Sequence, residues 1–219
     1  MTPDRPLDQR DDRPEPMFNA PWPAVLAAAS IVISNFALGW ASDEAIYWLA
    51  LEPLRVWSGD VAGLVTSLFV HGGWIHALMN AAFALAFGAP VARLLGLGAR
   101  GGGLFVLFYI VCGVLAGLGY AALHPQSTSL VVGASGAVAG LMGGAARLLD
   151  RPGRLSGLFA PRAMSLALGW LVINLVMAAL GGFPGLTGAV AWEAHLVGFA
   201  AGALLISPVA WLARRSETH

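Results

Sequence analysis

The chain has 219 residues, of which 58% are hydrophobic and only 11% are charged, and its mean hydropathy is +0.73. A soluble domain carries about 25% charged residues, so the composition excludes an ordinary soluble protein and indicates an integral membrane protein. The net charge is zero, which gives no reason to expect nucleic acid as a partner. The single cysteine, Cys112, excludes an intramolecular disulfide.

Residues 1–21 are rich in Pro, Asp and Arg and are predicted to form a disordered cytoplasmic tail. Six apolar segments follow, and each is a predicted transmembrane helix, although the fourth is short, since a helix needs about 20 residues to cross the hydrocarbon core. These spans are Trp22–Trp40, His76–Leu95, Leu104–Leu123, Ser135–Leu149, Ala163–Leu180 and Val190–Leu212. The runs do not alternate as strands would. The prediction is an all-α membrane bundle over 22–213 with a short cytoplasmic tail at 214–219.

Two connections between the spans have a distinctive composition. The segment Ala41–Asp60 mixes acidic residues with Trp and Tyr, which is typical of a loop that rests in the membrane interface, with short helices in it. Arg100–Gly103 contains three consecutive glycines and is predicted to be a turn between the second and third spans.

The arginines give the orientation of the spans. All twelve basic residues are arginine, and with six spans eleven of them fall on one side, whereas only Arg55 falls on the other. The positive-inside rule then places both termini in the cytoplasm. With no signal peptide recognisable, we expect a bacterial inner-membrane protein whose remaining polar residues face the outer side.

Ser135 lies at the head of the fourth span, within the sequence Gly133-Ala134-Ser135-Gly136. It stands twelve residues before Arg147, or about 18 Å above the inner boundary at the helical rise, which predicts a position below the outer surface. A serine at a helix N-terminus is a candidate nucleophile beside free backbone N–H groups. The alternative interpretation is a simple helix N-cap.

Further polar side chains lie at the outer ends of other spans. His195 in the sixth span is a candidate general base. Counted from Arg214 along a straight helix it stands too high to meet Ser135, so either this span tilts or, as we prefer, its last turn with Pro208 projects beyond the membrane. His76 and Asn80 share one helix face as i and i+4 and are candidate oxyanion donors.

The same polar residues are also compatible with roles other than catalysis. Each histidine is also compatible with a bond to a neighbouring backbone or helix, and His71, His76 and His195 together are a conceivable metal site. Glu193 is two residues from His195 and points to a different helix face, so it is not expected to act as a triad acid. Asn174 in the fifth span is expected to serve interhelical packing.

Glycine spacing predicts contact between the fourth and sixth spans. Gly136, Gly140 and Gly144 recur every four residues, as do Gly198 and Gly202. Faces of small residues let helix backbones approach closely. Such contact would bring Ser135 and His195, which head the two faces, together.

With these residues placed, the chain resembles the rhomboid family of intramembrane serine proteases. The matching segments are His71–Asn80 (HGGWIHALMN), Gly133–Gly136 (GASG) and Ala194–Gly202 (AHLVGFAAG). All three occur in family-like order on a six-span topology. The resemblance implies a six-helix rhomboid-like bundle that binds and cleaves transmembrane protein substrates within the lipid bilayer, near a membrane boundary.

The resemblance also implies a role for each residue. Ser135 and His195 would form a catalytic dyad without a third acid, and the Ser135 backbone N–H, His76 and Asn80 would stabilise the oxyanion. The motif residues His71, Gly133 and Gly136 would support this site. No metal or organic cofactor is expected. An inactive rhomboid-like protein that binds transmembrane clients is the alternative.

Two positions depart from the family pattern. Ala139, one turn after Ser135, stands where many members carry an aromatic ring that stacks on the dyad histidine. Val197 stands where a glycine is frequent. Both departures are expected to affect how firmly His195 is oriented, and neither removes a reacting group.

Overall fold

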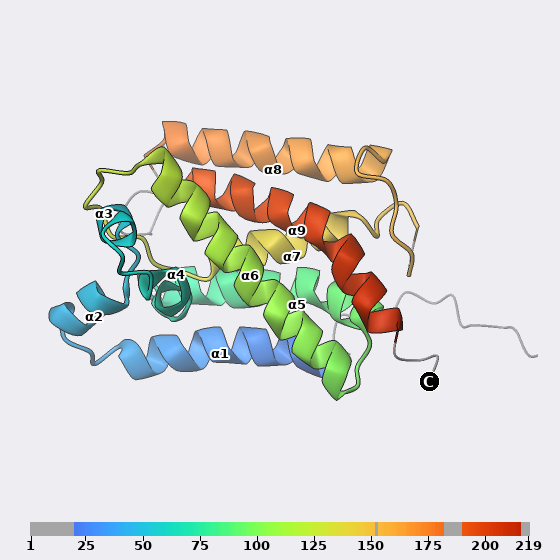
Figure 1. The fold of residues 1–219 in the computed structure, drawn as a ribbon, viewed down its shortest axis with the longest axis horizontal. Helices are drawn as coiled ribbons and strands as arrows, with labels where there is room; N and C mark the ends of the chain where they lie inside the picture. The colour runs from blue at the N-terminus through green and yellow to red at the C-terminus, as the bar shows by residue number, and fades with distance from the viewer. Residues whose placement is uncertain (1–19, 152, 182–189, 216–219) are drawn as a thin grey trace, which may run out of the picture.

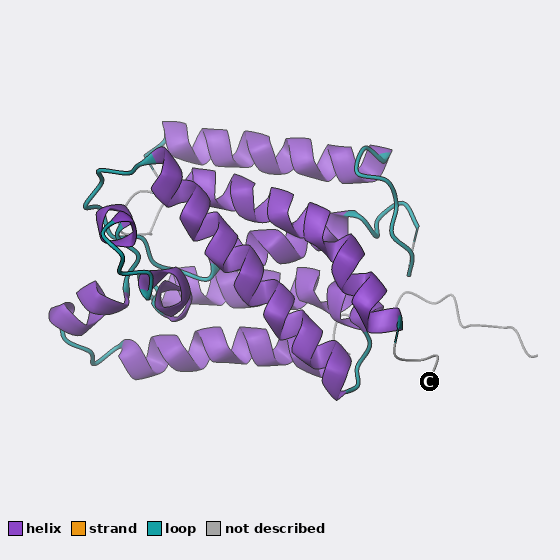
Figure 2. Ribbon diagram, viewed as in Figure 1, coloured by secondary structure: helices purple, strands orange, loops and turns teal. Residues whose placement is uncertain are grey.

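A computed structural model describes residues 20–151, 153–181 and 190–215, and across these residues Figure 2 shows helices and loops only. The predicted all-α class is therefore confirmed. Most of the predicted tails, 1–21 and 214–219, lie outside the described residues. Six apolar helices form the bundle (Figure 1): α1 (Trp22–Leu38), α5 (Trp74–Leu95), α6 (Ala99–Leu123), α7 (Ser135–Ala146), α8 (Pro161–Ala179) and α9 (Trp192–Arg214).

The helix lengths separate these six into two groups. Among the described residues, α5, α6, α8 and α9 are long and apolar enough to cross a membrane, whereas α1 has 17 residues and α7 only 12. The shortness of α7 arises at its C-terminal end, where the Arg147 carbonyl accepts hydrogen bonds from the Ser156 N–H at 2.7 Å and the Ser156 hydroxyl at 2.8 Å. The helix therefore ends three residues before the predicted Leu149.

The predicted turn at Arg100–Gly103 is wrong, because these residues are the first turns of α6. A Cβ on Gly101 would overlap the carbonyls of Leu95 and Gly96, and a Cβ on Gly102 would overlap the indole of Trp22. Gly101 and Gly102 thus allow close approach and do not form a turn. They let α6 start directly beside the end of α5 and the start of α1.

Between α1 and α5 the chain forms four short helices, α2 (Asp43–Leu49), α3 (Pro53–Trp57), α4 (Gly63–Thr66) and the 3₁₀ turn η1 (Ser67–Phe69). This segment is tied to the loop after α6 by two backbone bonds between Leu51 and Val131, at 2.8 and 2.9 Å. Within this segment, the Arg55 guanidinium donates two hydrogen bonds to the Asp60 carboxylate, at 2.6 and 2.9 Å. These bonds lower the pKa of the Asp60 carboxyl.

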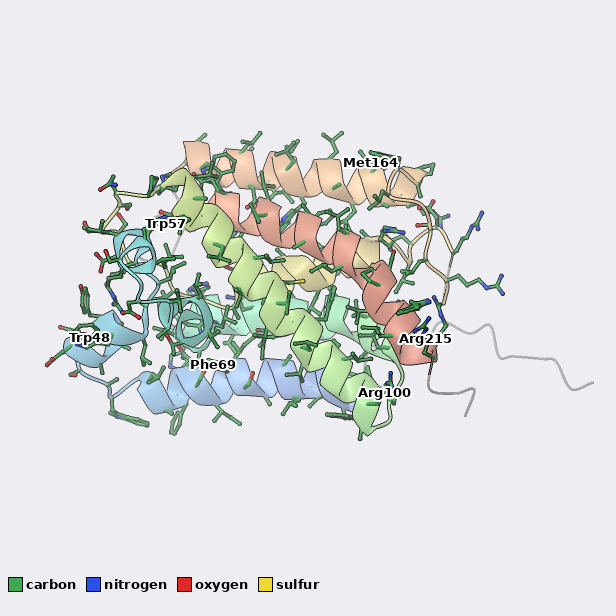
Figure 3. The ribbon with its side chains drawn as sticks, viewed as in Figure 1. Trp48, Trp57, Phe69, Arg100, Met164 and Arg215 are labelled. Atoms are coloured by element: carbon green, nitrogen blue, oxygen red, sulfur yellow. The ribbon has the colours of Figure 1, made fainter. Side chains whose placement is uncertain are left out.

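Aromatic and basic side chains mark opposite ends of the bundle. Figure 3 shows Trp48 and Trp57 at the end formed by α2 and α3, and Arg100 and Arg215 at the other end. This separation agrees with the sequence-based expectation that the arginines gather on one side and the aromatic interface loop on the other.

α7 is the centre of the bundle. Every residue from Gly136 to Ala146 is buried, and the helix packs against α5, α6 and α9 (Figure 1). The contact with α9 is the most extensive helix pair in the fold. α7 begins at Ser135, so the fold carries this residue into the interior of the protein.

The glycine faces predicted from the sequence meet across α7 and α9. A Cβ on Gly198 would overlap the Gly136 carbonyl, and one on Gly202 would overlap the Gly140 carbonyl. From α7, a Cβ on Gly143 would overlap the Phe199 carbonyl. The two backbones are therefore in direct contact, which fixes the register of α9 against α7.

α8 lies at the edge of the bundle beside α9 (Figure 1). Of its nineteen residues only Ala163 and Asn174 are buried, and the outward face carries exposed apolar side chains such as Leu168 and Val172. Such a face suits contact with lipid. α8 is accordingly the least enclosed of the long helices.

Arg147 joins the C-terminal end of α7 to the middle of α9, and its loss is expected to destabilise the fold. Its Nε donates to the Ser156 carbonyl at 2.6 Å and its Nη1 to the Ala203 carbonyl at 2.7 Å. Arg147→Ala removes both hydrogen bonds from the charged guanidinium and should lower the free energy of unfolding by about 3 kcal/mol. Unfolding in detergent followed by tryptophan fluorescence measures this. Arg151→Ala is the matched control, since Arg151 is exposed, and equal stability of the two variants would contradict the assignment.

Candidate active site

Ser135 and His195 are in hydrogen-bonding contact. The His195 Nε2 lies 2.8 Å from the Ser135 Oγ, although the residues are sixty positions apart. The register of α9 against α7, fixed at Gly198 and Gly202, places the two side chains at the same level. The contact that the glycine faces predict between these two residues is therefore present, whereas the projection of the last turn of α9 beyond the membrane stays a prediction.

The backbone before Ser135 turns sharply. Gly133 adopts φ +121°, a conformation that L side chains rarely take. A Cβ at this position would also lie 2.7 Å from His76 Cε1. The Gly133 N–H donates to the Ser67 carbonyl at 2.9 Å, and the Ala134 N–H donates to His71 Nε2 at 3.3 Å. Gly133 is thus required by the turn and by its histidine neighbour.

His71, His76 and Asn80 lie on the other side of this turn. The rings of His71 and His76 meet edge to face, with centroids 5.2 Å apart. His76 Nδ1 accepts from the Gly72 N–H at 3.3 Å, so in a neutral ring the hydrogen is on Nε2. Asn80 is buried and donates one amide hydrogen to the His76 carbonyl at 3.1 Å. The Nε2–H of His76 and the second amide hydrogen of Asn80 are the donors that this group offers to the cavity that Ser135 also lines.

A cavity of about 710 Å³ joins these groups. Its lining includes Ser135, His195, His76 and Asn80, together with residues of the loop after α6 and of α8. The structure thus brings all four principal residues predicted from the sequence into one space. His71 does not line this cavity; it acts on the site through its bond to Ala134.

One residue of this site, Asn174 of α8, was not among the site residues predicted from the sequence. Its Oδ1 lies 2.8 Å from His195 Nδ1, and it too lines the cavity. Trp170, one turn earlier, places its ring 5.8 Å from the His195 ring at an angle of 37°. The expectation that Asn174 serves only helix packing is therefore incomplete, because its partner is the candidate base.

Glu193 points elsewhere, as expected. Its Oε1 lies 3.0 Å from His124 Nε2, and this pair joins the end of α6 to the start of α9. Among the described residues, the hydrogen-bond partners of the His195 ring are Asn174 and Ser135, and neither is an acid.

The two departures from the family pattern have different surroundings. Ala139 is 1% exposed and lines the cavity, so no aromatic ring from α7 reaches His195 there. Val197 packs toward α6, where a Cβ on Gly119 would come within 2.7 Å of its Cγ2. The valine thus fits because α6 has a glycine opposite it, and its bulk does not press on the site.

The histidines do not assemble a metal site in this part of the structure. Among the described residues, no group of three or more His, Cys, Asp or Glu side chains is placed to hold a metal ion. The metal site considered for His71, His76 and His195 therefore has no counterpart in the described geometry.

Comparison with known proteins adds one finding. The family model described as "Rhomboid domain" matches residues 58–211, which is more than two thirds of the chain and includes α5 to α8 and most of α9. Ser135, His195, His76, Asn80 and Asn174 all fall within the matched range. No curated protein sequence matches the chain.

Proposed function

Because this integral membrane protein belongs to the rhomboid family, we propose that it is an intramembrane serine endopeptidase with Ser135 and His195 as its catalytic dyad. The observation that carries the proposal is the 2.8 Å contact between the Ser135 Oγ and the His195 Nε2 inside an apolar bundle. Polar side chains at membrane depth are costly and are commonly functional. A serine bonded to a histidine there is equipped for acyl transfer.

The reaction follows the geometry of this pair. The Ser135 oxygen attacks the carbonyl carbon of the scissile bond while His195 Nε2 takes the hydroxyl proton. The same nitrogen returns that proton to the leaving amine, which leaves an acyl ester on Ser135. Water, deprotonated by His195, then attacks the ester, and the second product leaves with Ser135 restored.

Three donors are suited to stabilise the oxyanion. The Ser135 backbone N–H is at the first position of α7, where helix N–H groups have no intrahelical partner. The His76 Nε2–H and the second amide hydrogen of Asn80 lie around the same cavity. Donors fixed before the reaction stabilise the developing charge without having to reorganise. Gly133 and Gly136 support this arrangement because they allow the close backbone approaches around Ser135.

The substrates we propose are transmembrane proteins cut near a membrane boundary. The cavity combines apolar residues such as Met79 and Phe83 with the polar groups of the site, which suits an extended segment that leaves the lipid bilayer. The arginine distribution supports cytoplasmic termini and a site that opens to the outer side of a bacterial inner membrane. The proposed reaction requires no metal or organic cofactor.

The proposal is tested by reconstituting the protein in liposomes with a model transmembrane substrate. The wild-type protein is expected to cleave the substrate and to react with a fluorophosphonate, whose phosphorus bonds to the Ser135 oxygen as fluoride leaves. Ser135→Ala should abolish both signals. Ser165→Ala is the matched control, because Ser165 is exposed on α8 and bonds only the Pro161 carbonyl at 2.9 Å. A folded wild-type protein that neither cleaves nor is labelled would instead support an inactive, client-binding rhomboid-like protein.

A further inference from the structure

Asn174 is a buried polar residue on a helix whose other side chains are mostly apolar and exposed or half-buried. α8 is the least enclosed long helix, and its side chains are mostly exposed or half-buried, yet Asn174 is only 2% exposed. An amide inside an apolar bundle is costly unless its hydrogen bonds are satisfied. The partners of this amide therefore indicate why an asparagine stands here.

Both ends of the Asn174 amide have a partner, and together they determine its orientation. The Nδ2 donates to the Trp170 carbonyl at 2.8 Å, and the Oδ1 lies 2.8 Å from His195 Nδ1. A flipped amide would place its oxygen against the Trp170 carbonyl oxygen, where two acceptors repel each other. The Trp170 carbonyl thus holds the amide with its oxygen toward His195.

This orientation determines which nitrogen of His195 carries the hydrogen. An amide oxygen only accepts hydrogen bonds, so a 2.8 Å contact requires the hydrogen on His195 Nδ1. In the neutral ring, Nε2 is then the acceptor, and it faces the Ser135 Oγ. This is the tautomer that a general base needs in order to take the serine proton.

No other described side chain supports the imidazole in this way. Ala139 offers only a methyl group from α7, and Glu193 is turned to His124. Trp170 contributes a ring face near the imidazole, on the same helix as Asn174. The serine and histidine come from α7 and α9, whereas the groups that orient the histidine come from α8.

We propose that Asn174 is a positioning residue that fixes the tautomer and the ring plane of His195 by accepting a hydrogen bond from Nδ1. This inference rests on the proposed function, because its kinetic consequence requires His195 to act as a base. The structural part concerns the protonated nitrogen of His195 and holds whether or not the protein cleaves a substrate.

The kinetic test compares Asn174→Leu and Asn174→Asp with the wild-type protein in liposomes. Asn174→Leu removes the acceptor and is expected to lower kcat about tenfold, equivalent to ~1.4 kcal/mol, with KM changed less than twofold. Asn174→Asp keeps an oxygen toward Nδ1 and should recover part of the lost kcat. Leu175→Ala is the matched control, because Leu175 is exposed on α8 and does not line the cavity.

A spectroscopic test does not depend on cleavage. With ¹⁵N-labelled histidine, the His195 signals, assigned by their loss in His195→Gln, are expected to show the hydrogen on Nδ1 in the wild-type protein. In Asn174→Leu this preference should weaken, whereas in Leu175→Ala it should not. A hydrogen on Nε2 in the wild-type protein would overturn the proposal even if every variant fails to fold. So would a wild-type kcat in folded Asn174→Leu. If Ser135 proves unreactive while Nδ1 carries the hydrogen, the proposed function fails and the positioning assignment stands.

Discussion

His195→Ala is expected to lower kcat for substrate cleavage by roughly a thousandfold, since a positioned general base contributes about 10²–10⁴. Without the imidazole, the Ser135 hydroxyl has no described acceptor for its proton at the 2.8 Å distance that His195 Nε2 provides. KM should change little, because the imidazole acts on the serine rather than on the bulk of a transmembrane substrate. Initial rates over a substrate series in liposomes measure both constants.

Two comparisons make this result specific. His124→Ala removes a histidine at the end of α6 whose ring bonds Glu193 of α9 rather than Ser135. This substitution should lower kcat at most a few-fold. The double variant Ser135→Ala/His195→Ala should be no slower than either single variant, because residues that act as a unit are not additive. Residual activity within tenfold of wild type in His195→Ala would mean that another group serves as the base.

The meeting of Ser135 and His195 was predictable because it depends on a local pattern. Glycines at every fourth residue permit one kind of contact between two helices, and that contact sets their register. Counting residues from Arg214 along a straight helix placed His195 above Ser135, so it required a tilt of that span or a last turn beyond the membrane for the two to meet. The close contacts at Gly198 and Gly202 are the ones that the glycine spacing predicts.

The depth of Asn174 could have been predicted by the same count of residues that was applied to Ser135. Asn174 lies twelve residues from Arg162, just as Ser135 lies twelve residues from Arg147. Equal rise on both helices predicts equal depth, so the sequence held a signal that Asn174 reaches the level of the dyad. The contact of Asn174 with His195 was not predictable. Because α8 is apolar on all faces, its sequence does not indicate which face of the helix turns toward the bundle.

The glycines of Arg100–Gly103 illustrate a different limit. Three glycines in a row read as a turn because glycine lowers helix propensity. In the fold all three are helical, and the end of α5 and Trp22 occupy the space where side chains on Gly101 and Gly102 would be. Local propensity is overridden here by contacts with residues up to eighty positions away, which no short window of sequence contains.

The contact between α7 and α9 provides the second large expected effect. Gly202→Val places a branched side chain against the Gly140 carbonyl and Cα. These are backbone atoms, which cannot rotate away as a side chain would, so the helices have to separate. Overpacking typically costs 1–3 kcal/mol and occasionally more. We expect a loss of about 3 kcal/mol in the free energy of unfolding.

The same substitution should also abolish most of the activity. His195 lies seven residues before Gly202, close to two helical turns along the same face. A shift of α9 by about 1 Å would lengthen the 2.8 Å contact between His195 and Ser135 beyond hydrogen-bonding range. Gly103→Val is the matched control, since a Cβ on that helical glycine meets no atom within 4 Å. Unfolding in detergent and cleavage in liposomes should both distinguish the two variants. If Gly202→Val kept wild-type stability and rate, the register of α9 against α7 would not be what brings the base to the serine.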